Sequence, residues 1–204
     1  MFASLASAQA LPGSVEFGAE GGRFYGGSFA KGSNRQFQHR VEVDDDILSG
    51  FWLGAQLTRK WGVEVSVRRT STQIVEPQSG VFPNEPGLAT IDIASIEARA
   101  VRVFPYGNFV PYLAAGAGTT NLDVNVSDRS IRDVNRFGIS LAVGAKFYAA
   151  RWVGARIDFR GRATYLGRRG LGQDQGWTDT GRWFRDSEIS GGVFFAFDVK
   201  HSAR

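Results

Sequence analysis

The sequence contains no cysteine, which excludes a disulfide framework and any thiolate metal site. It has only two histidines, His39 and His201, so it offers few groups for imidazole chemistry. It also lacks an uncharged apolar run of about 18 residues, the length that a transmembrane helix needs. These absences leave two broad classes open, soluble proteins and β-barrels, because a barrel turns only alternate residues toward lipid.

Lysine is also scarce, since only four of the 24 basic residues are lysine and the others are arginine. Arginine pairs bidentately with carboxylates and stays charged, so it suits buried ion networks better than lysine does. The net charge of +4 is small, and the arginines alternate with acids instead of forming a basic stripe. We therefore expect no binding to nucleic acid.

What is present is an alternation of apolar and polar residues with a period of two, the pattern of a β-strand. In one segment Trp61, Val63 and Val65 alternate with Glu64 and Ser66. About eight such segments occur, and their lengths match the 9–11 residues of a tilted membrane-spanning strand. They cover residues 15–25, 47–58, 61–72, 90–104, 109–126, 136–148, 152–165 and 187–199.

Two details of the strand pattern lead to further predictions. Ile91 and Ile93 fall out of phase with Ile96, which predicts a β-bulge near Ala94. Short turns at 59–60, 105–108 and 149–152 alternate with long polar stretches at 26–46, 73–89, 123–135 and 166–186. Outer-membrane barrels have short periplasmic turns and long outer loops, so an even strand number places both termini in the periplasm.

The first ten residues end in Ala8-Gln9-Ala10, which has the small-x-small form of a signal-peptidase site. We interpret residues 1–10 as a signal-peptide remnant and residues 11–204 as a single barrel domain. The predicted fold class is all-β, a closed antiparallel up-and-down transmembrane β-barrel of about eight strands.

Alternation does not decide which face is inside, because a soluble lipocalin-like barrel has the same period with reversed polarity. The polar face, however, carries six acids and six bases, and an unpaired buried charge costs about 3–5 kcal/mol. This balance favours a filled ionic lumen with lipid outside. The predicted lumen residues are Glu16, Glu20, Glu64, Arg68, Glu97, Arg99, Lys146, Arg156, Asp158, Arg160, Arg162 and Glu188.

Aromatic residues gather at the short-turn ends of the predicted strands, where a membrane-interface girdle is expected. They are Trp61, Phe104, Tyr106, Phe109, Phe147, Tyr148 and Trp152. In a soluble barrel these rings would be exposed to water without benefit, so the girdle also favours a membrane barrel.

Two strand sequences resemble those of a known family. The run Pro111-Tyr112-Leu-Ala-Ala-Gly-Ala-Gly118 after a tight turn is similar to a strand of the OmpA-like and opacity-type small outer-membrane β-barrels. The run from Ser187 to Phe197 is similar to their closing strand, which in the family carries the signal for barrel assembly. The resemblance implies a location in the bacterial outer membrane. One departure is that Asp198 to Arg204 follow Phe197, whereas the family strand usually ends on an aromatic residue.

The sequence predicts no enzyme, cofactor or metal site. His39 has only the loop residue Ser33 as a neighbouring nucleophile. Next to His39, Asp44-Asp45-Asp46 could bind calcium through oxygen, but a solvated acidic loop accounts for this run better. The lumen charges could form a narrow pore, but a barrel of about eight strands leaves room only for side chains, which favours a salt-bridge plug.

One predicted loop, residues 166–186, combines arginine with tryptophan: Arg168, Arg169, Trp177, Arg182, Trp183 and Arg185. Such a loop at a membrane rim could bind lipopolysaccharide phosphates or an extracellular partner, or it could be an ordinary loop with interfacial tryptophans. We expect a monomer with a structural, adhesive or surface-binding role. Its expected partners are outer-membrane lipid, lipopolysaccharide and an extracellular partner bound by the long loops.

Overall fold

The computed structural model describes residues 12–31, 40–75, 89–126, 129–166 and 183–198. The described residues form ten strands and no helix. The strands are β1 (Ser14–Tyr25), β2 (Ser28–Lys31), β3 (Arg40–Val43), β4 (Asp46–Gln56), β5 (Trp61–Val75), β6 (Ala89–Val103), β7 (Phe109–Val126), β8 (Arg129–Ala150), β9 (Val153–Tyr165) and β10 (Trp183–Asp198). The predicted signal-peptide remnant at residues 1–10 lies outside the described residues.

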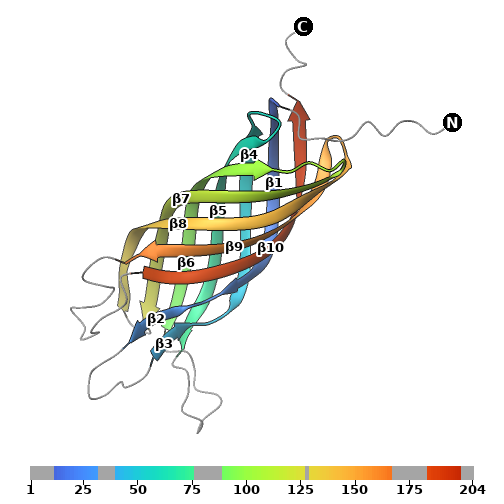
Figure 1. The fold of residues 1–204 in the computed structure, drawn as a ribbon. Helices are drawn as coiled ribbons and strands as arrows, with labels where there is room; N and C mark the ends of the chain where they lie inside the picture. Colours follow the sequence, from blue (N-terminus) through green and yellow to red (C-terminus); the bar gives the residue numbers. More distant parts are fainter. Residues whose placement is uncertain (1–11, 32–39, 76–88, 127–128, 167–182, 199–204) are drawn as a thin grey trace, which may run out of the picture.

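Eight of the strands close into a barrel (Figure 1). Each of β4 to β9 pairs antiparallel with the next strand in sequence, and β1 pairs with both β4 and β10. The first strand therefore meets the last, from Ser14 opposite Asp198 to Tyr25 opposite Ser187. This confirms the prediction of a closed antiparallel barrel of eight strands. In the described part of the chain, no helix is long and apolar enough to cross a membrane.

The connections at the two ends of the barrel differ, as Figure 1 shows. The end where β1 begins and β10 finishes carries the short turns after β4, β6 and β8. At the other end, the chain between β1 and β4 forms the hairpin β2–β3, and β3 continues the sheet by pairing Glu42 with Val75 of β5. We call these the short-turn end and the long-loop end.

The prediction of a long loop at residues 123–135 is wrong. Strand β7 runs to Val126 and β8 starts at Arg129, with these two residues paired and one register shift between Leu122 and Val124. The polar composition hid these strand residues, because a β-ladder needs only backbone hydrogen bonds. Apolar alternation marks a strand only where one of its faces meets an apolar environment.

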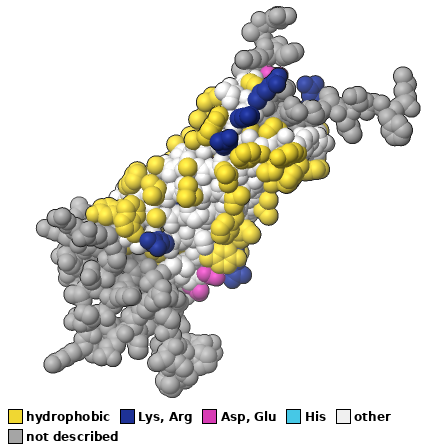
Figure 2. Space-filling model, viewed as in Figure 1, with side chains coloured by type: hydrophobic (Ala, Val, Ile, Leu, Met, Phe, Trp, Pro, Cys, Tyr) yellow, Lys and Arg dark blue, Asp and Glu magenta, His cyan; other side chains and the backbone are white. Residues whose placement is uncertain are grey.

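Large apolar side chains cover the middle of the barrel wall on its outside (Figure 2). Examples are Phe51, which is 70% exposed, and Leu141, which is 71% exposed. Charged side chains border this band on both sides, among them the ion pair of Arg69 with Asp92 at 3.5 Å toward the long-loop end. A contiguous exposed apolar surface of this extent is typical of a protein whose middle faces hydrocarbon.

The inside of the barrel changes its polarity along the axis. At the long-loop end the inward side chains form an apolar cluster: Phe24, Val43, Leu48, Ile91, Ile93, Leu122, Leu166 and Phe184. Strand β6 pairs without any register shift from Thr90 to Val103, so the predicted bulge near Ala94 is wrong. Ile91 and Ile93 fall out of phase because here the apolar residues face inward, whereas in the middle of the wall they face outward.

An arginine placed in the middle of the outer band should destabilise the barrel. We expect Val65→Arg to lower the free energy of unfolding by about 2–4 kcal/mol, the cost of a cation near the middle of a bilayer. Ser71→Arg, which faces outward on the same strand beyond Arg69, should change it by less than about 1 kcal/mol. Denaturant unfolding in lipid vesicles measures both, and equal losses would contradict a hydrocarbon-facing band.

The polarity change can be tested by a matched pair of isoleucine truncations. Ile93→Ala removes a buried side chain from the apolar cluster and should lower the free energy of unfolding by about 2–5 kcal/mol. Ile47→Ala, at a position that is 76% exposed, should cost clearly less. The same unfolding assay compares them. A smaller loss of unfolding free energy in Ile93→Ala than in Ile47→Ala would contradict the inward placement of Ile93 and favour the predicted bulge.

Candidate functional site

The inward face of the barrel wall carries the largest set of charged side chains. All twelve residues predicted for the lumen are buried, each with less than a tenth of its surface exposed. Sequence reasoning missed one further buried acid, Asp186. It had been assigned to a loop, although it shares the alternation of Glu188 and Ser190. Extending the strand pattern a few residues backwards would have found it.

Glu64 lies at the centre of the network, between two arginines. Its carboxylate accepts hydrogen bonds from Arg99 and, at 2.8 Å, from Arg156. Asp158 also pairs with both arginines, at 3.4 Å from Arg99. The Arg156 Nε donates to the Tyr112 hydroxyl at 2.7 Å, which fixes the guanidinium in one orientation. Two acids and two bases thus compensate one another away from water.

A second group of ion pairs lies nearer the long-loop end. Arg68 bonds to Glu20 at 2.6 Å and also to Glu188. Glu188 in turn pairs with Arg162 at 3.1 Å, and Asp186 pairs with the same arginine at 3.1 Å. The missed acid Asp186 is therefore the second carboxylate partner of the buried Arg162.

Arg160 is held less tightly than the other lumen arginines. Its side chain is fully buried, yet the nearest carboxylate oxygens are those of Glu97 at 3.6 Å and Asp158 at 3.9 Å. None of its three nitrogens has a hydrogen-bond acceptor among the described residues. Contacts of this length suit water-mediated bridging, which would keep the cation compensated.

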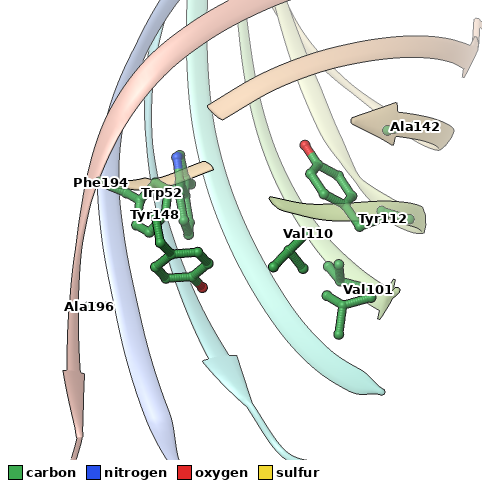
Figure 3. Close-up of a cluster of buried hydrophobic side chains, with 10 residues drawn as sticks. Trp52, Val101, Val110, Tyr112, Ala142, Tyr148, Phe194 and Ala196 are labelled. Carbon is green, nitrogen blue, oxygen red and sulfur yellow. The ribbon is translucent and has the colours of Figure 1, made fainter. Parts of the chain in front are cut away.

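The cations nearest the short-turn end lie close to aromatic rings, among them those of Trp52 and Tyr112, which Figure 3 shows. The ring of Trp52 lies 5.0 Å from the Lys146 ammonium and 4.6 Å from the Arg156 guanidinium. Glu16 accepts hydrogen bonds from Lys146 and from the Tyr148 hydroxyl. The aromatic residues of these contacts belong to an apolar cluster at this end. Its members are Trp52, Val101, Val103, Val110, Tyr112, Ala114, Ala142, Tyr148, Phe194 and Ala196.

Two inward glycines make room for these rings. A Cβ on Gly144 would overlap the phenol of Tyr112, and one on Gly154 would lie 2.5 Å from Phe194 Cζ. A narrow barrel can hold large inward rings only where the neighbouring strand lacks a side chain. Some of the many glycines thus shape the inner wall.

The predicted aromatic girdle is placed as follows. Trp61, Tyr106, Phe109, Phe147 and Trp152 are exposed at the short-turn end, and Phe104 is half-buried beside them. Tyr148 does not belong to the girdle, because it points into the barrel and bonds to Glu16. Its position has the same parity as Ser140 and Lys146 on β8, so the alternation itself contained this signal.

The predicted surface loop is only partly a loop. Trp183 and Arg185 belong to β10, where Trp183 pairs with Tyr165 and the two ring centroids are 5.1 Å apart. Arg168, Arg169, Trp177 and Arg182 lie outside the described residues. On neighbouring β1, the Arg23 guanidinium lies 5.9 Å from the Tyr25 ring. Outward-facing arginines and aromatic rings therefore occur together at this rim on β1, β9 and β10.

The residues considered for catalysis or metal binding form no such site in the described part of the chain. His39 and His201 lie outside it. Asp44, Asp45 and Asp46 each accept a hydrogen bond from a backbone amide near the β3–β4 turn. No group of three or more His, Asp or Glu residues that could hold a metal occurs among the described residues.

Comparison with known proteins identifies the fold. The family described as "Outer membrane protein beta-barrel domain" matches residues 1–197. OprG from Pseudomonas aeruginosa is similar over 94% of this chain and 99% of its own, with 14% identity and a TM-score of 0.67. The Neisserial surface protein A aligns over 91% of this chain and 99% of its own, with 15% identity and a TM-score of 0.62.

AlkL, solved in lipid bilayers, aligns over 98% of this chain and 97% of its own, with 12% identity and a TM-score of 0.61. No curated protein sequence matches the chain. The closed eight-stranded barrel, its apolar outer band and the family match over nearly the whole chain agree with one another. The chain belongs to the outer membrane protein β-barrel family and is a protein of the bacterial outer membrane.

Proposed function

We propose that this protein is a non-enzymatic outer-membrane barrel that is closed to solutes and acts through its outer rim as a surface-binding protein. The observation that carries the proposal is the filled lumen. An apolar cluster lies toward each end, most of the paired charges lie between the two clusters, and the Glu16–Lys146 pair lies among the residues of the short-turn cluster.

Each layer opposes the passage of ions for a different reason. The apolar clusters offer few polar groups to replace the hydration shell of an ion, and Glu16 beside the short-turn cluster is already bonded to Lys146 and Tyr148. The charges between them are bound to one another, and removing one partner of such a buried pair costs about 3–5 kcal/mol. An eight-stranded barrel has an interior just wide enough for side chains, so these layers leave no continuous aqueous channel.

The outer rim offers groups that suit lipopolysaccharide. Arg23 and Arg185 face outward near the edge of the apolar band at the long-loop end, beside Tyr25, Tyr165 and Trp183. Arginine binds phosphate through charge-assisted hydrogen bonds, and interfacial aromatic rings lie at headgroup level. We infer that this rim holds lipopolysaccharide phosphates, while the long loops beyond it are available to an extracellular partner.

A narrow ion pore is the second candidate, and one observation favours it. Arg160 is the arginine whose contacts within the described network are longest, at 3.6 and 3.9 Å. A guanidinium that is free to move could let ions pass the middle of the lumen. The apolar clusters at both ends remain the argument against this alternative.

Planar-bilayer recording separates the two candidates. We expect no discrete conductance from the wild type, and none from Arg160→Ala or Glu64→Ala, because the apolar clusters at both ends remain. Conductance steps that grow in either variant would establish the pore instead. Insertion of each folded protein is verified by its heat-dependent shift in detergent gels.

The rim proposal predicts a local effect on lipopolysaccharide binding. Arg23→Gln and Arg185→Gln should each weaken binding roughly fivefold, the equivalent of about 1 kcal/mol per basic residue near an anionic surface. Arg151→Gln, an exposed arginine at the opposite end, should leave it unchanged. Titration of the detergent-solubilised protein with lipopolysaccharide measures this, and equal binding by all variants would refute the proposal.

A further inference from the structure

The outer wall of β6 and β7 carries small side chains between the middle of the barrel and the short-turn end. Two pairs of outward alanines lie side by side on β6 and β7, and all four are exposed: Ala98 with Ala117, and Ala100 with Ala115. Val65 on β5 pairs with Ala98, and Leu141 on β8 pairs with Ala115. Because alanine projects a single carbon, the wall is lower here over the width of two strands, about 10 Å. We call this recess the alanine trough.

A basic side chain lies at the short-turn end of the alanine trough. Arg102 is the next outward residue after Ala100 on β6, and it pairs with Trp61 of β5. Its guanidinium lies 5.5 Å from the Trp61 ring and 5.5 Å from the Phe104 ring. Contact with two aromatic rings holds the cation at the border of the apolar band, where lipid headgroups lie.

Further positive charge adjoins Arg102 without nearby acid. Arg59 and Lys60 are exposed in the β4–β5 turn, and the Lys60 carbonyl accepts a hydrogen bond from the Val103 amide at 2.9 Å. That bond places the turn beside the end of β6. Among the described residues at this end, the one acid that does not face the lumen is Asp198 on β10, three strands away from β5 in the ring.

We propose that this surface binds one anionic glycerophospholipid, such as phosphatidylglycerol, from the periplasmic leaflet. Its phosphate lies against Arg102 and Lys60, and one acyl chain lies in the alanine trough. Charge complementarity selects the anionic headgroup, because Arg102 and the neighbouring turn residues Arg59 and Lys60 supply three cations with no acid beside them among the described residues. The leaflet follows from the topology, since short turns of outer-membrane barrels are periplasmic and lipopolysaccharide occupies the opposite leaflet.

Native mass spectrometry of the detergent-solubilised full chain with added phosphatidylglycerol tests the proposal. We expect one bound lipid on the wild type and clearly weaker binding of phosphatidylcholine. Arg102→Gln and Lys60→Gln should each lower the affinity roughly fivefold, from about 1 kcal/mol per basic residue. Arg102→Lys should keep most of the binding, because it retains the charge.

Substitutions in the trough test the acyl-chain contact separately from the charge. Ala100→Leu and Ala115→Leu fill the recess and should weaken binding, whereas Ala155→Leu, an exposed outward alanine on β9, should not. Arg151→Gln is the matched charge control at the same rim. All these side chains face outward, so each variant should fold, as the gel shift verifies.

Three results would overturn the proposal. Equal losses in Arg102→Gln and Arg151→Gln would show unspecific attraction of lipid to the rim. Equal binding of phosphatidylcholine and phosphatidylglycerol would show an ordinary lipid annulus. Lipopolysaccharide that displaces phosphatidylglycerol from the wild type but not from Arg102→Gln would assign the site to the other class of lipid.

Discussion

Closure of the backbone hydrogen-bond ring is the constraint on which the rest of this structure depends. Inside hydrocarbon no water is available to backbone amides and carbonyls, so a sheet can cross a membrane only if it has no free edge. The pairing of β1 with β10 removes the last edge. Eight strands then fix an interior that only side chains can fill, and the composition of the inward face follows from that limit.

The filled interior explains why the charges are so closely matched. Each lumen acid lies within reach of an arginine or lysine, and Glu64, Asp158 and Glu188 each serve more than one base. Sharing gives each of these carboxylates more than one cationic partner in a space that excludes water. Apolar clusters lie on either side of most of this network. The barrel is thus apolar outside and ionic inside at mid-height, and mainly apolar inside toward its ends.

The proposed closure of the lumen directs functional interest to the two rims, and the rims differ in chemistry. At the long-loop end, outward arginines accompany Tyr25, Tyr165 and Trp183, and one further arginine is compensated by Asp92. At the short-turn end, Arg59, Lys60 and Arg102 have no acid beside them among the described residues. Each rim therefore suits the anionic lipid of its own leaflet. These side chains lie on the outside of the hydrogen-bonded ring, so they can differ without changing the strand pairing.

The sequence by itself determined the eight strands of the ring, most of their limits and which residues face inward in the middle of the wall, but not the hairpin β2–β3. It could do so because a period of two separates the two faces of a strand, and the balanced acids and bases marked the polar face as the inner one. Only the tertiary structure decided where that rule reverses. Ile91 and Ile93 face inward in register without a bulge. Tyr148 and Asp186 follow the inward parity of their strands, but only the tertiary structure shows their partners, Glu16 and Arg162. Near the barrel ends the outside is no longer hydrocarbon, so alternation there no longer distinguishes inside from outside, and pairing across the lumen depends on strands distant in sequence.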